Sequence, residues 1–173
     1  VRYDPILLNS KYNVDYHVRA FNKLCTMLKG YVSKIIVSFV DDYKNVRNNH
    51  LDYHEPSNEE YLKLKEAFEK NDMKIVSCME NKYHIGDEKD CCISIKYAFE
   101  RTGKLFKEWK ARDCHCVNMV DVGAYNSCLH GCKYCYANFD SKQIVSNYKM
   151  HDVNSSLLIG HLNLDDQVKI RRK

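Results

Sequence analysis

The sequence predicts an α/β fold in which parallel strands form part of a TIM-type (β/α) barrel, followed by a C-terminal cysteine-rich loop. Two observations support this fold class. Short apolar runs with β-branched residues alternate with stretches of helical periodicity, which is typical of βαβ units. The strands that can be identified are also fewer than the eight of a closed barrel, so we expect an open sheet.

The first half of the chain alternates strand and helix. The predicted elements, in chain order, lie at 1–6, 14–28, 34–40, 57–70 and 74–79. The helix at 14–28 has apolar residues at three- and four-residue steps, and Ser57 with Glu60 forms a capping box for the second helix. The near-continuous apolar run at 34–40 predicts a buried parallel strand.

The second half leads to the cysteine loop. We expect a helix within 91–103 and a strand at 117–122 that runs into the loop. Within one domain, residues 1–111 form the partial (β/α) barrel units, 112–140 the cluster segment and 141–173 a C-terminal tail that packs on the barrel. Because Val1 already lies in a predicted strand, we expect the chain to continue upstream and to supply the first barrel strands there.

Net charge, apolar runs and cysteine content limit the classes of function that the protein can have. The formal charge of +4, from 27 basic and 23 acidic residues, is too small to indicate nucleic-acid binding without a clustered patch. Neither an apolar run of membrane-spanning length nor a signal peptide is present, so we expect a cytoplasmic protein that inserts in no membrane. In that compartment the nine cysteines indicate metal ligands rather than disulfides, and eight of them fall between Cys78 and Cys135.

Three cysteines stand in the pattern C-x3-C-x2-C: Cys128, Cys132 and Cys135. Three thiolates this close can hold one four-iron cluster and leave one iron without a protein ligand, where a small molecule can bind. The alternatives are a zinc site completed by His130 or Cys116, or three free thiols.

This spacing, with Tyr134 just before the third cysteine, resembles the signature of the radical SAM enzymes. The resemblance implies a 4Fe–4S cluster that binds S-adenosylmethionine (SAM) and cleaves it reductively to a 5′-deoxyadenosyl radical. It also implies that Tyr134 packs near the SAM adenine, that Gly131 permits tight backbone beside the cluster, and that an electron donor such as a flavodoxin or ferredoxin supplies the electron.

Nearly the whole chain resembles one uncharacterised family, the domain of unknown function family 1848. The similarity lies in the run from Cys114 to Asn138, in Arg2-Tyr3-Asp4-Pro5-Ile6 and in Val37-Ser38-Phe39-Val40-Asp41. The C-terminal cysteines of that family look like the radical SAM motif. A looser resemblance to spore photoproduct lyase-type proteins leaves a nucleic-acid or nucleotide substrate open.

A second metal site is predicted from the other cysteines. Cys114 and Cys116 form a C-x-C pair, Cys78 ends a predicted strand, and Cys92 belongs to an adjacent pair with Cys91. Cys78, Cys92, Cys114 and Cys116 would give four thiolates for an auxiliary Fe–S cluster or a zinc ion. The alternative is that these cysteines are buried small hydrophobic residues.

Arg2 and Asp4 are two residues apart on a predicted strand and therefore face the same side. On the interior of a barrel they would hold SAM or substrate, and a structural ion pair is the alternative.

The leading functional hypothesis is a radical SAM-like iron–sulfur protein that acts on an unknown substrate. The alternative is a non-catalytic iron–sulfur or zinc-binding module with a structural or electron-transfer role.

Overall fold

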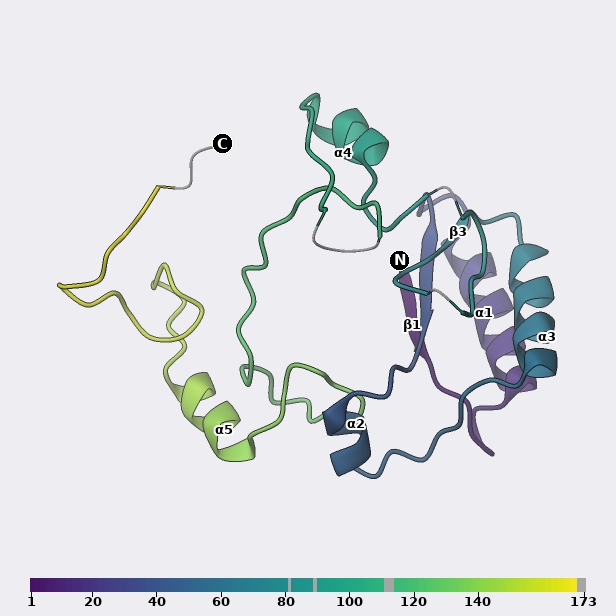
Figure 1. The fold of residues 1–173 in the computed structure, drawn as a ribbon, viewed down its shortest axis with the longest axis horizontal. Helices are drawn as coiled ribbons and strands as arrows, with labels where there is room; N and C mark the ends of the chain where they lie inside the picture. Colours follow the sequence, from purple (N-terminus) through teal and green to yellow (C-terminus); the bar gives the residue numbers. More distant parts are fainter. Residues whose placement is uncertain (81, 89, 111–113, 171–173) are drawn as a thin grey trace. The chain divides into compact units, whose positions relative to one another are not determined.

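The computed structural model describes residues 1–80, 82–88, 90–110 and 114–170. It divides into two compact units (Figure 1). The first unit comprises residues 1–41 and 52–119, and the second comprises residues 42–51 and 120–173. The predicted boundary between residues 111 and 112 lies outside the described residues.

The first unit contains a three-stranded parallel sheet in the order β1-β2-β3. The strands are β1 (Arg2–Ile6), β2 (Ile35–Phe39) and β3 (Ile75–Ser77). Ile36 pairs with Arg2 on one side and with Val76 on the other. Helix α1 (Val14–Leu28) connects β1 to β2, and α3 (Asn58–Glu69) precedes β3. The predicted parallel α/β arrangement and the capping box of Ser57 with Glu60 are confirmed.

Helices α1 and α3 cover one face of this sheet, where they lie side by side (Figure 1). Their contact is an aromatic stack: the rings of Phe21 and Phe68 are parallel, with centroids 3.8 Å apart. Tyr3 of β1 meets both rings edge-on, at 5.4 and 5.9 Å. Val37 and Ile35 of β2 are fully buried in the same cluster. Apolar packing on this face therefore explains why the first 80 residues fold as βαβ units.

The opposite face of the sheet has a different character. Strand alternation places Arg2, Ile36 and Val76 in register on this side. Ile36 packs against a cluster of cysteine residues here. Helix α4 (Ile95–Thr102) follows two of these cysteines, begins at the N-cap Ser94 and ends at Gly103, whose φ of +67° favours glycine. One face of the sheet is thus aromatic, and the other bears thiols.

The second unit has two short helices, α2 (Lys44–Asn48) and α5 (Ser141–Lys149), around the irregular segment 120–140. Sequence analysis expected neither helix. Helix α5 begins at Asp140, whose side chain accepts hydrogen bonds from the amides of Lys142 and Gln143. The buried residue of α5, Asn147, is polar.

The predicted strand at 117–122 is wrong. Of residues 117–122, all of which the structure describes, only Val117 forms a bridge, an isolated antiparallel one with Glu108. The amide of Val117 donates to Ile93 and that of Asn118 to Lys107, so loops rather than the sheet satisfy this backbone. In the part of the chain that the structure describes, the sheet has three strands and is not closed into a barrel. The TIM type of the fold stays a prediction.

In the described ranges, no helix combines the length and apolar character needed to cross a membrane.

Replacing Phe68 by alanine should lower the free energy of unfolding by about 3–5 kcal/mol, because the change removes half of a fully buried aromatic stack. Urea denaturation followed by circular dichroism measures the loss. Tyr31→Ala is the matched control, since Tyr31 is 86% exposed, and it should change stability little. Equal losses in the two variants would contradict this account of the core.

Candidate functional site

The three cysteines of the C-x3-C-x2-C motif lie on one exposed loop of the second unit. Cys128 and Cys132 are exposed, Cys135 is partly buried, and all three are free thiols. The amide of Cys135 donates to the carbonyl of Cys132 at 3.0 Å, which closes a turn. Gly131 adopts φ +62° before this turn, a backbone conformation that other residues rarely accept. The loop therefore presents its thiols to solvent.

Asn126 fastens the two ends of this loop. It is 1% exposed, and its Oδ1 accepts hydrogen bonds from the amides of Phe139 and Asp140 at 2.8 and 3.1 Å. Its Nδ2 donates to Gln143 of α5 at 2.7 Å, and its own amide donates to the carbonyl of Ala137. Asn126 has φ +54°, a left-handed conformation that asparagine tolerates better than most residues. One side chain thus ties the start of the loop to its end and to a helix.

Helix α2 supplies a second support for the loop. Asn45 Nδ2 faces the carbonyl oxygens of Cys135, Tyr136 and Asn138 at 3.1, 3.3 and 3.3 Å. Asn49 donates to the carbonyl of Lys133 at 3.0 Å. All of these contacts engage backbone carbonyls, so they fix the course of the loop without using a sulfur.

Asn138 completes the support within the loop itself, because its Nδ2 donates to the carbonyl of Cys128 at 2.6 Å. Tyr134, the aromatic residue before the third cysteine, is 41% exposed.

The donor set of this loop fits an iron–sulfur cluster, since three free thiols lie within eight residues on a supported loop that is open on one side. His130, an alternative zinc ligand, is exposed on the same loop, whereas Cys116 is buried in the first unit. Among the described residues, no three or more His, Cys, Asp or Glu side chains stand as a ready metal-binding group.

A second cysteine cluster lies in the first unit. Cys91, Cys92 and Cys116 are buried together, and Cys78 and Cys114 pack against them. The structure therefore brings together the four cysteines of the predicted second site and adds Cys91. These residues come from three segments of the chain, one after β3, one before α4 and one before the bridge at Val117.

Arg2 is the cation of this cluster. Its Nη1 lies 3.8 Å from Cys92 Sγ, and its guanidinium also hydrogen-bonds Cys78. Arg2 forms an ion pair with Asp4 at 2.6 Å, so the predicted pairing of these residues on one side of β1 is confirmed. Their predicted role in holding SAM or substrate stays a prediction.

Mutual contacts separate the pKa values of the thiols. A hydrogen bond with Cys92 lowers the pKa of Cys78 to about 6, aided by Arg2 and opposed by burial. The same hydrogen bond, together with burial, raises the pKa of Cys92. Burial and the neighbouring Cys116 raise the pKa of Cys91 to about 12, and burial raises that of Cys114. Cys78 is consequently the thiol of this group that ionises most readily.

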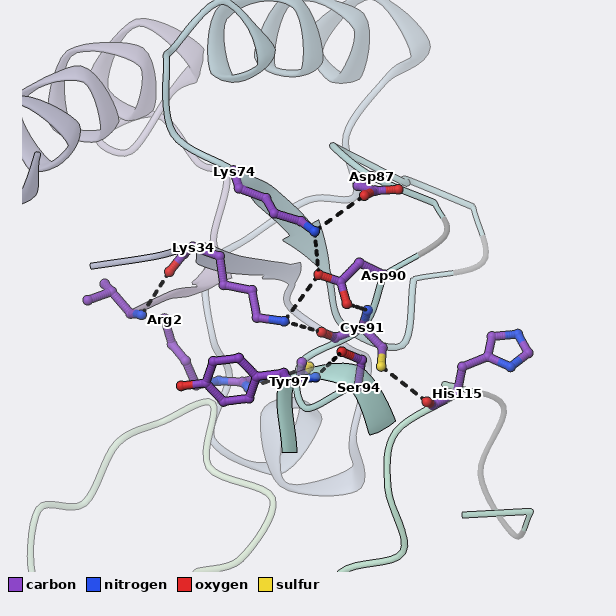
Figure 2. Close-up of polar contacts among 11 residues, drawn as sticks. Arg2, Lys34, Lys74, Asp87, Asp90, Cys91, Ser94, Tyr97 and His115 are labelled. Atoms are coloured by element: carbon purple, nitrogen blue, oxygen red, sulfur yellow. Dashed lines mark hydrogen bonds and ion pairs between the residues drawn. The ribbon is translucent and has the colours of Figure 1, made fainter. Parts of the chain in front are cut away.

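A charged network fixes the backbone at the adjacent cysteine pair, as Figure 2 shows. Lys34 Nζ donates to the carbonyl of Cys91 at 2.6 Å and lies 3.3 Å from Asp90. Asp90 accepts from the Cys91 amide at 2.9 Å and pairs with Lys74 at 2.8 Å. Burial acts to raise the pKa of Asp90, but Lys74, the Cys91 amide and Lys34 outweigh it and lower the pKa to about 2. Lys34 and Lys74 directly precede β2 and β3, so the network anchors the cysteine pair to the sheet.

Sequence reasoning missed Glu80, which follows β3. Its Oε1 accepts a hydrogen bond from the amide of Phe39, the last residue of β2, at 2.6 Å. Burial raises the pKa of Glu80 to about 7, with a smaller contribution from the charges of Asp41 and Cys78. The position of Glu80 beyond the C-terminal end of a parallel strand was the available signal, since such ends carry functional groups in (β/α) proteins.

Glu80→Gln should flatten the dependence of stability on pH. Because the folded protein holds the Glu80 proton more tightly than the unfolded chain, the stability that Glu80 contributes is fully present below pH 4.5 and is lost as the pH rises through about 7. Urea midpoints across that interval measure the effect, and Glu100→Gln on exposed α4 should keep the wild-type profile. A wild-type slope in Glu80→Gln would refute the assignment.

Asn126→Ala should loosen the cysteine loop. Losing buried hydrogen bonds costs about 1–3 kcal/mol, which corresponds to roughly 5- to 150-fold faster amide exchange at Phe139 and Asp140. Hydrogen–deuterium exchange of the metal-free protein measures this rate. Asn154→Ala is the control, because the Asn154 side chain hydrogen-bonds Asp152, two residues away and outside the cysteine loop. Unchanged exchange would mean that α2 alone supports the loop.

Comparison with known proteins agrees with the resemblance noted in the sequence. No curated protein and no solved structure matches the chain. One family model matches, described as "Domain of unknown function (DUF1848)", and it covers residues 1–137, the greater part of the chain and all three cysteines of the loop. The chain therefore belongs to the domain of unknown function family 1848.

Proposed function

We propose that this protein is a radical SAM-like enzyme whose Cys128, Cys132 and Cys135 hold a 4Fe–4S cluster. The observation that carries the proposal is the loop itself: two exposed cysteines and a partly buried one, all free thiols, lie on a backbone that Asn126 and Asn45 hold by hydrogen bonds. When bound, such a cluster supplies one electron to SAM, whose sulfonium C–S bond breaks to give methionine and a 5′-deoxyadenosyl radical.

The residues of the loop have separate tasks in this proposal. The three thiolates bind metal and leave one coordination position open, because no fourth cysteine stands on the loop. Gly131, between the first two ligands, permits the tight backbone that a cluster requires. Tyr134 offers an exposed ring that can pack on the adenine of SAM. Backbone amides of the loop can donate to cluster sulfurs and tune the reduction potential.

The partners proposed for this activity are SAM, a one-electron donor such as a flavodoxin or ferredoxin, and a substrate of unknown class. An exposed loop supports this proposal, since a protein donor must approach the metal closely. Arg2 and Asp4 are proposed to contact SAM or substrate from the thiol-bearing face of the sheet.

The test begins with anaerobic purification of the protein, expressed from its complete natural reading frame, and reconstitution with iron and sulfide. We expect about four irons and four sulfides per chain in the loop site, and air should bleach the visible absorption. After addition of dithionite and SAM, chromatography should detect 5′-deoxyadenosine and methionine. Cys132→Ala should abolish both products, and Cys25→Ala should keep them, because Cys25 is a buried core residue of α1.

Two outcomes would contradict the proposal in different ways. Zinc in the loop site without sulfide would end the iron–sulfur assignment. A reducible cluster that leaves SAM intact would replace the enzyme by the second candidate, a structural or electron-transfer module.

A further inference from the structure

The cysteine cluster of the first unit is unused by the proposed function. Cys78, Cys92, Cys114 and Cys116 lie together with Cys91 in one buried group, all as free thiols. Isolated buried cysteines are common as small hydrophobic residues. Five of them gathered from three separate segments, beside an arginine, indicate a site that was assembled for metal.

The spacing of the sulfurs favours a single ion over a cluster. Cys78 is hydrogen-bonded to Cys92, and Cys116 is hydrogen-bonded to Cys91 and to Cys114. A tetrahedral zinc ion with Zn–S distances of about 2.3 Å holds its four sulfurs close to one another, so it suits thiols that are already neighbours. A four-iron cube holds thiolates farther apart because iron and sulfide lie between them.

The two adjacent cysteines differ in their contacts. Cys91 Sγ lies 3.1 Å from the carbonyl oxygen of His115, to which its S–H donates. Cys92 Sγ instead faces Arg2 and Cys78. We therefore assign Cys92 as the ligand and Cys91 as a neighbour that keeps its proton.

The backbone of each ligand segment is already held in place. The Cys78 amide donates to Val37 of β2, and the Asp90 network fixes the chain just before Cys92. The carbonyl of Cys116 accepts from the Trp109 amide at 2.7 Å. In the described residues these sulfurs do not stand as a ready metal-binding group, so metal binding requires the cysteine side chains to change rotamer while the backbone stays in place.

We propose that Cys78, Cys92, Cys114 and Cys116 bind one zinc ion, independently of the C-x3-C-x2-C loop. Binding displaces the protons that the four cysteines still carry, which are released to solvent, and leaves four thiolates around one Zn²⁺ with a net charge of −2 on the centre. Arg2, within 3.8 Å of Cys92, offsets part of this charge. Four ligands with no open position make the site structural: it fastens the segments before α4 and around Val117 to the face of the sheet opposite α1 and α3.

The test uses the full chain with Cys128→Ala, Cys132→Ala and Cys135→Ala, which removes the loop thiols and leaves the cluster untouched. Elemental analysis should find about one zinc per chain and no acid-labile sulfide. Replacement of zinc by cobalt should give thiolate-to-cobalt charge-transfer absorption and the intense d–d bands of a tetrahedral site. This measurement needs no substitution in the cluster, so misfolding cannot explain its result.

Substitutions then identify the ligands. In the same background, Cys92→Ser should lower zinc affinity at least tenfold, whereas Cys91→Ser, the adjacent matched control, should retain it. Circular dichroism of α1 and α3 checks the fold of each variant. A loop variant that binds no stoichiometric metal, or that retains iron and sulfide, would overturn the proposal. Equal zinc affinity in the Cys91 and Cys92 variants would overturn the ligand assignment.

Discussion

The alternation of side chains across β1, β2 and β3 is the constraint on which the first unit depends. With a repeat of two residues, Tyr3 and Val37 point to one face and Arg2 and Ile36 to the other. Phe21 of α1 and Phe68 of α3 stack on each other and cover the first face. The second face is covered by the cysteine cluster and Arg2. A shift of strand register by one residue would turn the aromatic-facing side chains toward the cysteines and the reverse, so both sets of contacts would be lost.

The parts that sequence reasoning predicted are those with a local signal. Helix α1 has an apolar stripe, α3 has a capping box, and the three strands are short apolar runs; each pattern encodes its own element. The C-x3-C-x2-C spacing alone predicted that the cysteine loop binds metal. The proximity of Cys78 and Cys116 could also be predicted from the sequence, because cysteines that are concentrated in one region of a chain indicate a common site.

The features that sequence reasoning did not predict depend on contacts with residues that are distant in the sequence. Residues 117–122 are apolar enough to suggest a strand, but the loops at Ile93 and Lys107 take its hydrogen bonds. Helix α5 buries Asn147, whose Nδ2 donates to the carbonyl of Asn126. The raised pKa of Glu80 comes from burial at the end of a neighbouring strand, which no local pattern reports.

The cysteine loop is held almost entirely by asparagine side chains, among them Asn45, Asn49, Asn126 and Asn138. A carboxamide neither gains nor loses a proton in the physiological range, and it is inert to electron transfer. Carboxylates or lysines in the same places would attract or repel the sulfurs, with a force that depends on the charge of the thiols. Because these side chains are neutral, the shape of the loop does not depend on the charge at its sulfurs.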